Sequence, residues 1–255
     1  MTVSDPIHWQ LTGKPSLFSV SEIFHENSKI HKGVSSFIIS AEAIHAMSEG
    51  YKSYHFGPSI PLPMCDDPGS TSLSSCIKGR SSVRQYSQQP FSIDQLSAML
   101  RYSSAESVPG RRRPAPSAGA LFPLEIYPIC LNVNGIDRDA YHYNVRAHSL
   151  EPLCRSEHIE QIREALFVPE IGQSAAVIFV ITAVFGRTKI KYGERGYRFI
   201  LLEAGHVAQN ICLTATAMST GACPIGGYVD DTVNDILNVD GVEEAAIYLI
   251  SAGCV

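Results

Sequence analysis

The chain has 255 residues, 45% of them hydrophobic, and a formal net charge of −5 at pH 7. This length suits one sizeable domain with a single core. The mildly acidic balance argues against a nucleic-acid-binding protein, and no apolar run is long enough for a membrane helix. The N-terminus lacks the basic and apolar segments of a secretory signal, so we expect a cytoplasmic protein.

The cysteines also favour a cytoplasmic protein. Their number is odd, and no two of them share a CxxC spacing. Such a set is typical of reduced thiols and predicts neither a disulfide framework nor a zinc site. The seven positions are Cys65, Cys76, Cys130, Cys154, Cys212, Cys223 and Cys254.

We divide the chain into an N-terminal extension with a proline-rich connector, residues 1–70, and a compact domain, residues 71–255. Residues 1–57 look mostly helical but have no strong apolar period. Residues 58–70 concentrate proline, glycine, aspartate and serine, as connectors do. Ser92 and Gln95 then form a capping box, which predicts the start of a helix.

The rest of the chain alternates apolar runs with amphipathic segments. Glu125–Leu131, Ala176–Phe185 and Ala245–Ser251 are short, apolar and rich in β-branched or aromatic residues, which predicts buried strands. Tyr141–Leu153 is typical of a hairpin turning near Asn144, and Ser156–Leu166 of an amphipathic helix.

Phe199–Ser219 is apolar on nearly all sides, which predicts a helix buried all round and ending at Gly221. Its many small residues would let another helix approach closely. Glu203 and His206 stand within it. Lone polar residues in such a helix are more often satisfied core groups than catalysts, and we keep that interpretation for His206.

The first candidate site is a short basic cluster. Arg80 and Arg84 flank Ser81 and Ser82, and the two guanidinium groups could converge on one phosphate if the segment enters a helix. The serine hydroxyls would add donors. Without other support, a cluster of this kind is more often solvated surface.

The second candidate is a loop that starts with three arginines, residues 111–113. Prolines at 114, 116 and 123 fix an extended path, while Ala118, Gly119 and Ala120 leave room for close backbone approach. Such a loop suits a flat anionic ligand. A rigid connector would explain the prolines but not the adjacent arginines.

Two more segments carry candidate groups. Gly226 and Gly227 expose backbone amides that could donate to a flavin ring nitrogen, although ordinary glycine turns are common. Lys191 and Tyr192 lie in a predicted loop between a buried strand and a buried helix, and both side chains can transfer protons. The plainer interpretation of that loop is a solvated basic turn.

Taken in order, these segments resemble the nitroreductase superfamily, and within it the SagB/McbC-type azoline dehydrogenases. The matching motifs are SSVRQYS after Arg80, RRPAPSAGALFPLEIY, the YHY hairpin, KYGERGYR, LLEAGHVAQN and ACPIGGY. The resemblance covers roughly Ser74 to Ala252. Its most specific parts are the PSAGALFPLE block and the later KY…RGYR.

The resemblance implies an α+β flavin fold, with a central, mostly antiparallel sheet flanked by helices, and a homodimer with FMN at its interface. It assigns the FMN phosphate and ribityl chain to Arg80, Ser81, Ser82 and Arg84. It assigns flavin contacts from the partner subunit to Pro116, Ser117 and Gly119, and contacts with the ring to Gly226 and Gly227. Lys191 and Tyr192 match the pair considered catalytic.

One feature departs from the pattern. Many nitroreductases carry basic residues after the final strand, whereas this sequence ends Ala252-Gly253-Cys254-Val255. We therefore expect the phosphate to depend on Arg80 and Arg84, and on Arg112 or Arg113.

The resemblance implies an FMN-dependent dehydrogenase that oxidises peptide thiazolines or oxazolines to thiazoles or oxazoles, with a cyclodehydratase as a partner. Two alternatives stay open. One is an NAD(P)H-dependent nitro- or quinone reductase, since nitroreductases bind nicotinamide without the GxGxxG fingerprint, which is absent here. The other is a flavin-free subunit that docks peptide or partner enzymes.

Overall fold

A computed structural model describes residues 19–30, 51–65, 67–106 and 112–255. In this part of the chain, seven strands form one sheet in the order β1-β4-β3-β2-β5-β7-β6, and all neighbouring strands are antiparallel. The strands are β1 (Ile60–Pro61), β2 (Leu124–Cys130), β3 (Asp139–Asn144), β4 (Ser149–Pro152), β5 (Val177–Val184), β6 (Gly221–Ile225) and β7 (Glu244–Gly253).

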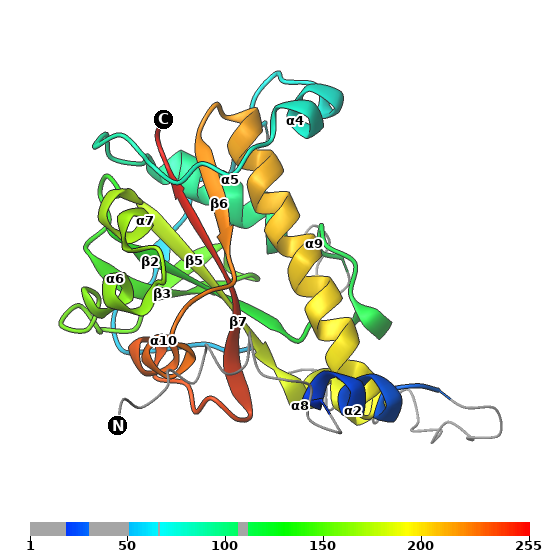
Figure 1. Cartoon of the computed structure of the whole chain (residues 1–255). Helices are drawn as coiled ribbons and strands as arrows, with labels where there is room; N and C mark the ends of the chain where they lie inside the picture. Colours follow the sequence, from blue (N-terminus) through cyan, green and yellow to red (C-terminus); the bar gives the residue numbers. More distant parts are fainter. Residues whose placement is uncertain (1–18, 31–50, 66, 107–111) are drawn as a thin grey trace, which may run out of the picture.

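Helices cover both faces of the sheet (Figure 1). α5 (Ile93–Ser104) and α9 (Arg195–Ala217) pack on one face, and α6 (Gln161–Ala165), α7 (Pro169–Ser174) and α10 (Asp230–Leu237) pack on the other. Alternate residues of the central strands supply the two cores: Phe179 and Ile181 face α9, whereas Ile178 and Val180 face α10. The expected α+β fold with a central antiparallel sheet is confirmed.

The remaining helices lie at the edges of these layers. They are α2 (Val20–Asn27), α4 (Leu73–Gly79), the single 3₁₀ turn η1 (Ala118–Ala120) and α8 (Phe185–Tyr192). Phe24 of α2 packs edge-on against Tyr197 of α9. No helix in the described ranges has the length and apolar character needed to cross a membrane.

Several local predictions are confirmed. Ser92 caps α5 with the expected reciprocal bonds, since its hydroxyl accepts from the Gln95 amide at 3.1 Å and its own amide donates to the Gln95 side chain at 2.8 Å. The three predicted buried strands are β2, β5 and β7. The predicted hairpin is β3–β4, whose register pairs Asn144 with Ser149.

The segment before α9 differs from the prediction. Strand β5 stops at Val184, and most of the loop expected at residues 191–198 is helical: Lys191 and Tyr192 end helix α8, and residues 195–198 begin α9. The helical hydrogen bonds are favoured here because α8 buries Arg187 and Thr188 while packing beside α9. Similarly, the helix expected over Ser156–Leu166 shortens to α6, preceded by turns.

Helix α9 also departs from its predicted environment. It starts four residues earlier than expected and ends at Ala217, where Ser219 rather than Gly221 adopts the left-handed conformation, with φ 56°. One face is not buried in the chain: Leu201 and Leu202 are 43% and 61% exposed. His206 lies on this exposed face, so its interpretation as a core group is wrong. The apolar pattern alone could not distinguish burial by this chain from an uncovered apolar face.

Residues 51–62 contact the sheet, and Ile60–Pro61 form its strand β1. β1 pairs with β4 at Ile60↔Leu150, and Lys52 forms an ion pair with Glu244 of β7. Tyr54 shares hydrogen bonds with the buried Tyr127 and Lys52. The division at residue 70 stays a prediction, but the last part of the N-terminal extension is tied to the domain. The other residues of the mostly helical expectation, 1–18 and 31–50, lie outside the described residues.

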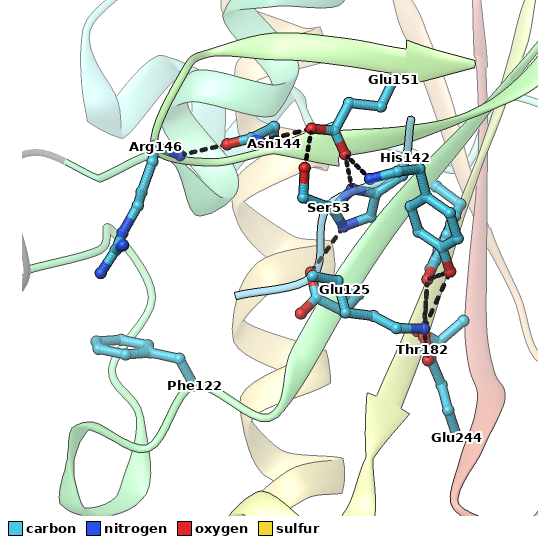
Figure 2. Close-up of polar contacts among 12 residues, drawn as sticks. Ser53, Phe122, Glu125, His142, Asn144, Arg146, Glu151, Thr182 and Glu244 are labelled. Atoms are coloured by element: carbon cyan, nitrogen blue, oxygen red, sulfur yellow. Dashed lines mark hydrogen bonds and ion pairs between the residues drawn. The ribbon is translucent and has the colours of Figure 1, made fainter. Parts of the chain in front are cut away.

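The hairpin β3–β4 contains a buried charged cluster (Figure 2). His142 lies between Glu125 and Glu151, with 2.9 Å from its Nε2 to one carboxylate and 2.9 Å from its Nδ1 to the other. Burial opposes ionisation of both acids. Nevertheless, the bond from His142 and the charge of Arg187 lower the pKa of Glu125, and bonds from Asn144 and His142 lower the pKa of Glu151.

The cluster predicts a specific loss of stability in acid. Because both folded-state pKa values lie below 4.5, ionised Glu125 and Glu151 stabilise the fold above that pH, and this stabilisation is lost as the pH falls through the folded values. Glu125→Gln should lose about 3 kcal/mol at pH 7, since it leaves the buried Arg187 guanidinium without its carboxylate, and should show a shallower loss between pH 5 and pH 3. Urea unfolding at several pH values measures both effects.

Glu157→Gln is the matched control, because the Glu157 side chain is 80% exposed. It should unfold like the wild type at every pH. Parallel acid profiles for the wild type and Glu125→Gln would contradict the assignment.

Candidate active site

Lys191 and Tyr192 lie against the loop that contains Gly119. A Cβ atom added at Gly119 would be 2.8 Å from the Tyr192 hydroxyl and 3.0 Å from Lys191 Nζ. The tertiary structure therefore brings two separately predicted motifs into contact within one chain. Tyr192 also packs edge-on against Phe199, with 5.0 Å between the ring centroids, which connects the pair to the N-terminal part of α9.

The loop at residues 117–122 has an unusual backbone. Gly119, Ala120 and Phe122 have φ values of 65°, 54° and 45°. Non-glycine residues adopt the left-handed region at a cost of about 1–2 kcal/mol each, so the surroundings must hold them there. Ser117 supplies part of that restraint, since its hydroxyl accepts from the Phe122 amide at 3.0 Å and its carbonyl from the Ala120 amide at 3.1 Å.

Glu203 belongs to the same site. It lies on the buried face of α9, close to Ser117. Burial raises the pKa of Glu203 to about 7, although the nearby Ser117 hydroxyl and the charge of Arg113 oppose the shift. Its ionisation therefore changes near neutral pH, as is common for groups that exchange protons in active sites. Sequence reasoning noted Glu203 but did not connect it to the loop, because that contact depends on the packing of α9.

Arg113 faces into this region as well. Its guanidinium lies 4.6 Å from the centre of the Phe122 ring, and its Nε is a buried donor without a partner among the described residues. Arg112 and Pro116 are exposed. Arg111 lies outside the described residues.

The segment from Arg80 to Arg84 does not enter a helix. Arg80 is the C-terminal cap of α4, and the next residues run beside β6, with the Val83 amide donating to the Ala222 carbonyl at 3.0 Å. The condition on which helical convergence of the two arginines depended is therefore not met. Ser81 and Arg84 are exposed, and Arg80 and Ser82 are partly exposed. Within the described ranges, neither arginine forms an ion pair.

The basic cluster and the Lys191–Tyr192 pair lie towards opposite ends of α9. Burial raises the pKa of Cys212 to about 11, and the charge of nearby Arg80 opposes this shift. Tyr192 instead contacts Phe199, thirteen residues earlier, which corresponds to about 20 Å along the helix. One chain thus does not gather all the predicted site residues around a single point.

The paired glycines follow β6. A Cβ atom at Gly226 would have no heavy atom within 4 Å, so its backbone is open to a ligand. A Cβ atom at Gly227 would lie 3.1 Å from the ring of Phe167, whose amide donates to the Gly227 carbonyl at 3.2 Å. Phe167, which the sequence did not single out, forms an exposed apolar wall beside the glycines.

The chain belongs to the nitroreductase family, whose model matches residues 77–254. A protein of Methanocaldococcus jannaschii whose name describes it as a nitroreductase is 34% identical over 66% of this chain and 84% of its own length. The microcin B17-processing protein McbC of Escherichia coli is 31% identical over 58% of this chain and 57% of its own. The trifolitoxin-processing protein TfxB of Rhizobium leguminosarum is 28% identical over 61% and 45%. The chain thus spans about half the length of the two processing proteins.

Solved structures share the fold. A chain described as a nitroreductase from Anabaena variabilis superposes with a TM-score of 0.70 at 22% identity, over 95% of this chain and 49% of that one. A chain of the E. coli microcin synthetase McbBCD complex, solved with truncated pro-MccB17 bound, gives a TM-score of 0.63 at 22% identity and covers 92% of both chains. These likenesses show the fold, and the family match over residues 77–254 makes the protein a nitroreductase-family oxidoreductase.

The contact at Gly119 predicts different effects for two glycine substitutions. Gly119→Ala and Gly135→Ala both place a side chain at positive φ, so each should destabilise the fold by about 1–2 kcal/mol. Only Gly119→Ala should displace Tyr192, since nothing lies within 4 Å of the Cβ position at Gly135. Urea unfolding and the NMR ring resonances of isotope-labelled tyrosine measure the two effects. Unshifted Tyr192 resonances in Gly119→Ala would argue against the contact.

Proposed function

We propose that the protein is an FMN-dependent dehydrogenase that oxidises a thiazoline or oxazoline of a peptide to a thiazole or oxazole. The observation that carries the proposal is the contact of Lys191 and Tyr192 with Gly119 in the PSAGAL loop. These are the motifs that most specifically resemble the azoline dehydrogenases. McbC and TfxB, which are named as processing proteins of microcin B17 and trifolitoxin, support a peptide substrate.

The residues present fit a flavin. Arg80 and Arg84 offer cationic forks for a phosphate, and the open backbone at Gly226 can approach a flat ring. A nitroreductase from Desulfovibrio desulfuricans, solved in complex with FMN, superposes with a TM-score of 0.50 at 17% identity. When bound, the flavin would accept the hydride from the azoline ring.

The protein's own residues would handle the proton. Lys191 and Tyr192 end α8 beside the loop, with the ammonium group 5.3 Å from the centre of the tyrosine ring. Amine and phenol groups can both exchange protons, so either side chain could take the acidic Cα proton of the azoline. Glu203, behind Ser117, could hold a proton at neutral pH.

We further propose a homodimer formed through the exposed face of α9. In a two-fold interface of antiparallel helices, the N-terminal half of one α9 faces the C-terminal half of the other. The basic cluster of one subunit would then approach the Lys191–Tyr192 pair of its partner, which accounts for their separation of about 20 Å within one chain. Leu201 and Leu202 would lose their exposure to water in that interface.

Binding of FMN should therefore depend on both the basic cluster at Arg80 and Arg84 and the exposed face of α9. Arg80→Ala or Arg84→Ala should weaken FMN binding by roughly ten- to a hundredfold, the effect of losing one charge-assisted bond to phosphate. Leu202→Arg should give monomers that also lose FMN. Fluorescence-quenching titrations and light scattering measure affinity and mass.

Two matched controls accompany these variants. Lys78→Ala removes a cation from the neighbouring helix α4, and Val242→Arg places a charge at a residue that is 73% exposed and outside α9. Both should bind FMN as dimers. A flavin-loaded monomer, or full affinity in both arginine variants, would contradict the proposed site.

Lys191→Ala and Tyr192→Phe should separate chemistry from binding. Both variants should stay yellow and folded, whereas oxidation of an azoline peptide should fall by about 10²–10⁴-fold, the usual contribution of a positioned proton-transfer group. Lys189→Ala is the control, because Lys189 lies on the same helix but pairs with Glu194 at 3.0 Å. Wild-type rates in both variants would remove the pair from the mechanism, and loss of flavin would make it a binding element.

A second candidate is an NAD(P)H-dependent nitro- or quinone reductase. The family assignment and the 34% identity to the M. jannaschii protein favour it. Steady NADPH oxidation with a quinone, without oxidation of azoline peptides, would select this function. A colourless chain that cannot be reconstituted with FMN would instead favour a docking subunit. A partnership with a cyclodehydratase is also a proposal, supported by the McbBCD complex.

A further inference from the structure

The loop at residues 117–122 needs an external anchor. Three of its residues, Gly119, Ala120 and Phe122, have positive φ, and its Gly119 is the point against which Lys191 and Tyr192 rest. The bonds of Ser117 lie within the loop and fix its shape, but not its position relative to α8. A displacement of the loop along α8 would separate Gly119 from the pair.

Arg187 provides a bond between α8 and the loop. It is only 8% exposed, and its Nη1 donates to the Phe122 carbonyl at 3.2 Å. Arg187 stands four residues before Lys191, so the two side chains leave neighbouring turns of the same helix. Helix α8 is thus hydrogen-bonded to the loop through Arg187, one helical turn before the Lys191–Tyr192 pair.

Arg187 is held in turn by a buried hydrogen-bonded network of ionisable side chains. The same Nη1 donates to Glu125 at 2.6 Å. His142 is hydrogen-bonded to both Glu125 and Glu151, at 2.9 Å in each case. Both ring nitrogens of His142 lie within hydrogen-bond distance of a carboxylate oxygen, one from Glu125 and one from Glu151 (Figure 2). His142 therefore joins the two buried carboxylates to each other.

At its far end, this hydrogen-bonded network reaches the N-terminal segment through Glu151. Glu151 accepts bonds from the Ser53 hydroxyl at 2.8 Å, the Tyr54 amide at 2.8 Å and the Asn144 side chain at 2.7 Å. Its oxygens are thus fully engaged and cannot turn away from His142. Apolar residues could often fill such a space at no loss of stability. A buried network of ionisable side chains that reaches the active-site loop therefore indicates a role in fixing the position of the loop.

We propose that Arg187 is a positioning residue that holds the 117–122 loop against Lys191 and Tyr192, and that Glu125, His142 and Glu151 fix Arg187 for this task. The positioning is a property of the fold. Its effect on turnover rests on the function proposed above.

Hydrogen exchange tests the positioning without reference to activity. In the FMN-loaded protein, Arg187→Met should speed exchange of the Ala120 and Phe122 amides by about tenfold or more, because the loop loses its bond to α8. Amides of β5 and β7 should keep their wild-type rates. Unchanged exchange in the loop of a folded Arg187→Met protein would overturn the proposal.

Two further variants separate positioning from stability. Tyr127 lies on the same strand as Glu125, and Tyr127→Phe removes its 2.9 Å bond to buried Glu244 of β7 but no contact of the loop, so loop exchange should match the wild type. Arg187→Lys keeps the charge beside Glu125 on a side chain one bond shorter, so it should fold even where Arg187→Met does not, with intermediate loop exchange. Equal acceleration in Tyr127→Phe and Arg187→Lys would reduce the effect to general destabilisation and overturn the proposal.

Turnover gives the second readout. With an azoline peptide, Arg187→Lys should lower kcat at least tenfold with little change in KM, since the loop moves relative to the proton-transfer pair while the peptide surface stays. If the wild-type protein does not oxidise azolines, the proposed function fails while the exchange result still decides the role of Arg187. Faster hydrogen exchange of the loop amides together with a wild-type kcat would overturn the catalytic part of the proposal.

Discussion

Helix α9 sets the distances on which the rest of the site depends. It is a rigid rod of 23 residues, about 35 Å long, with one face in the core and the other uncovered. Its N-terminal part contacts Tyr192 through Phe199, its middle contacts Ser117 through Glu203, and its C-terminal part lies near Arg80. Because a helix does not shorten, the two ends of the site stay apart in one chain, and this separation underlies the proposal that two chains complete each site.

The loop at residues 117–122 shows why small residues matter here. Gly119 leaves the space into which the Tyr192 hydroxyl and Lys191 Nζ extend, and any side chain there would meet both. The left-handed residues around it raise the free energy of the loop, which is held by the bonds of Ser117 within it and by the bond of Arg187 from α8. The position of two reactive side chains therefore depends on residues that bear no chemistry of their own.

Relatives of the family share this framework at low identity. The sheet and its helices superpose on the Anabaena variabilis chain and on a chain of the McbBCD complex, both at 22% identity. Such likeness shows the fold alone, since the same fold hosts different reactions. What distinguishes members must therefore lie in the site, and here the PSAGAL loop and the Lys191–Tyr192 pair set the chemistry that we propose.

The sequence by itself determined the elements whose signals are local. Alternating and continuous apolar runs located β2, β5 and β7, and the Ser92–Gln95 capping box located the start of α5. Motif order also indicated the family. These signals are local because strand burial and helix capping depend on residues a few positions apart.

Only the tertiary structure decided what depends on distant contacts. It placed Lys191 and Tyr192 at the end of helix α8 instead of in the expected loop, exposed one face of α9 with His206, and brought Glu203 close to Ser117. It also assembled Glu125, His142, Glu151 and Arg187, four ionisable residues from three strands and a helix. No local pattern marks them, because a charge is stable in the core only when its partner arrives from another part of the chain.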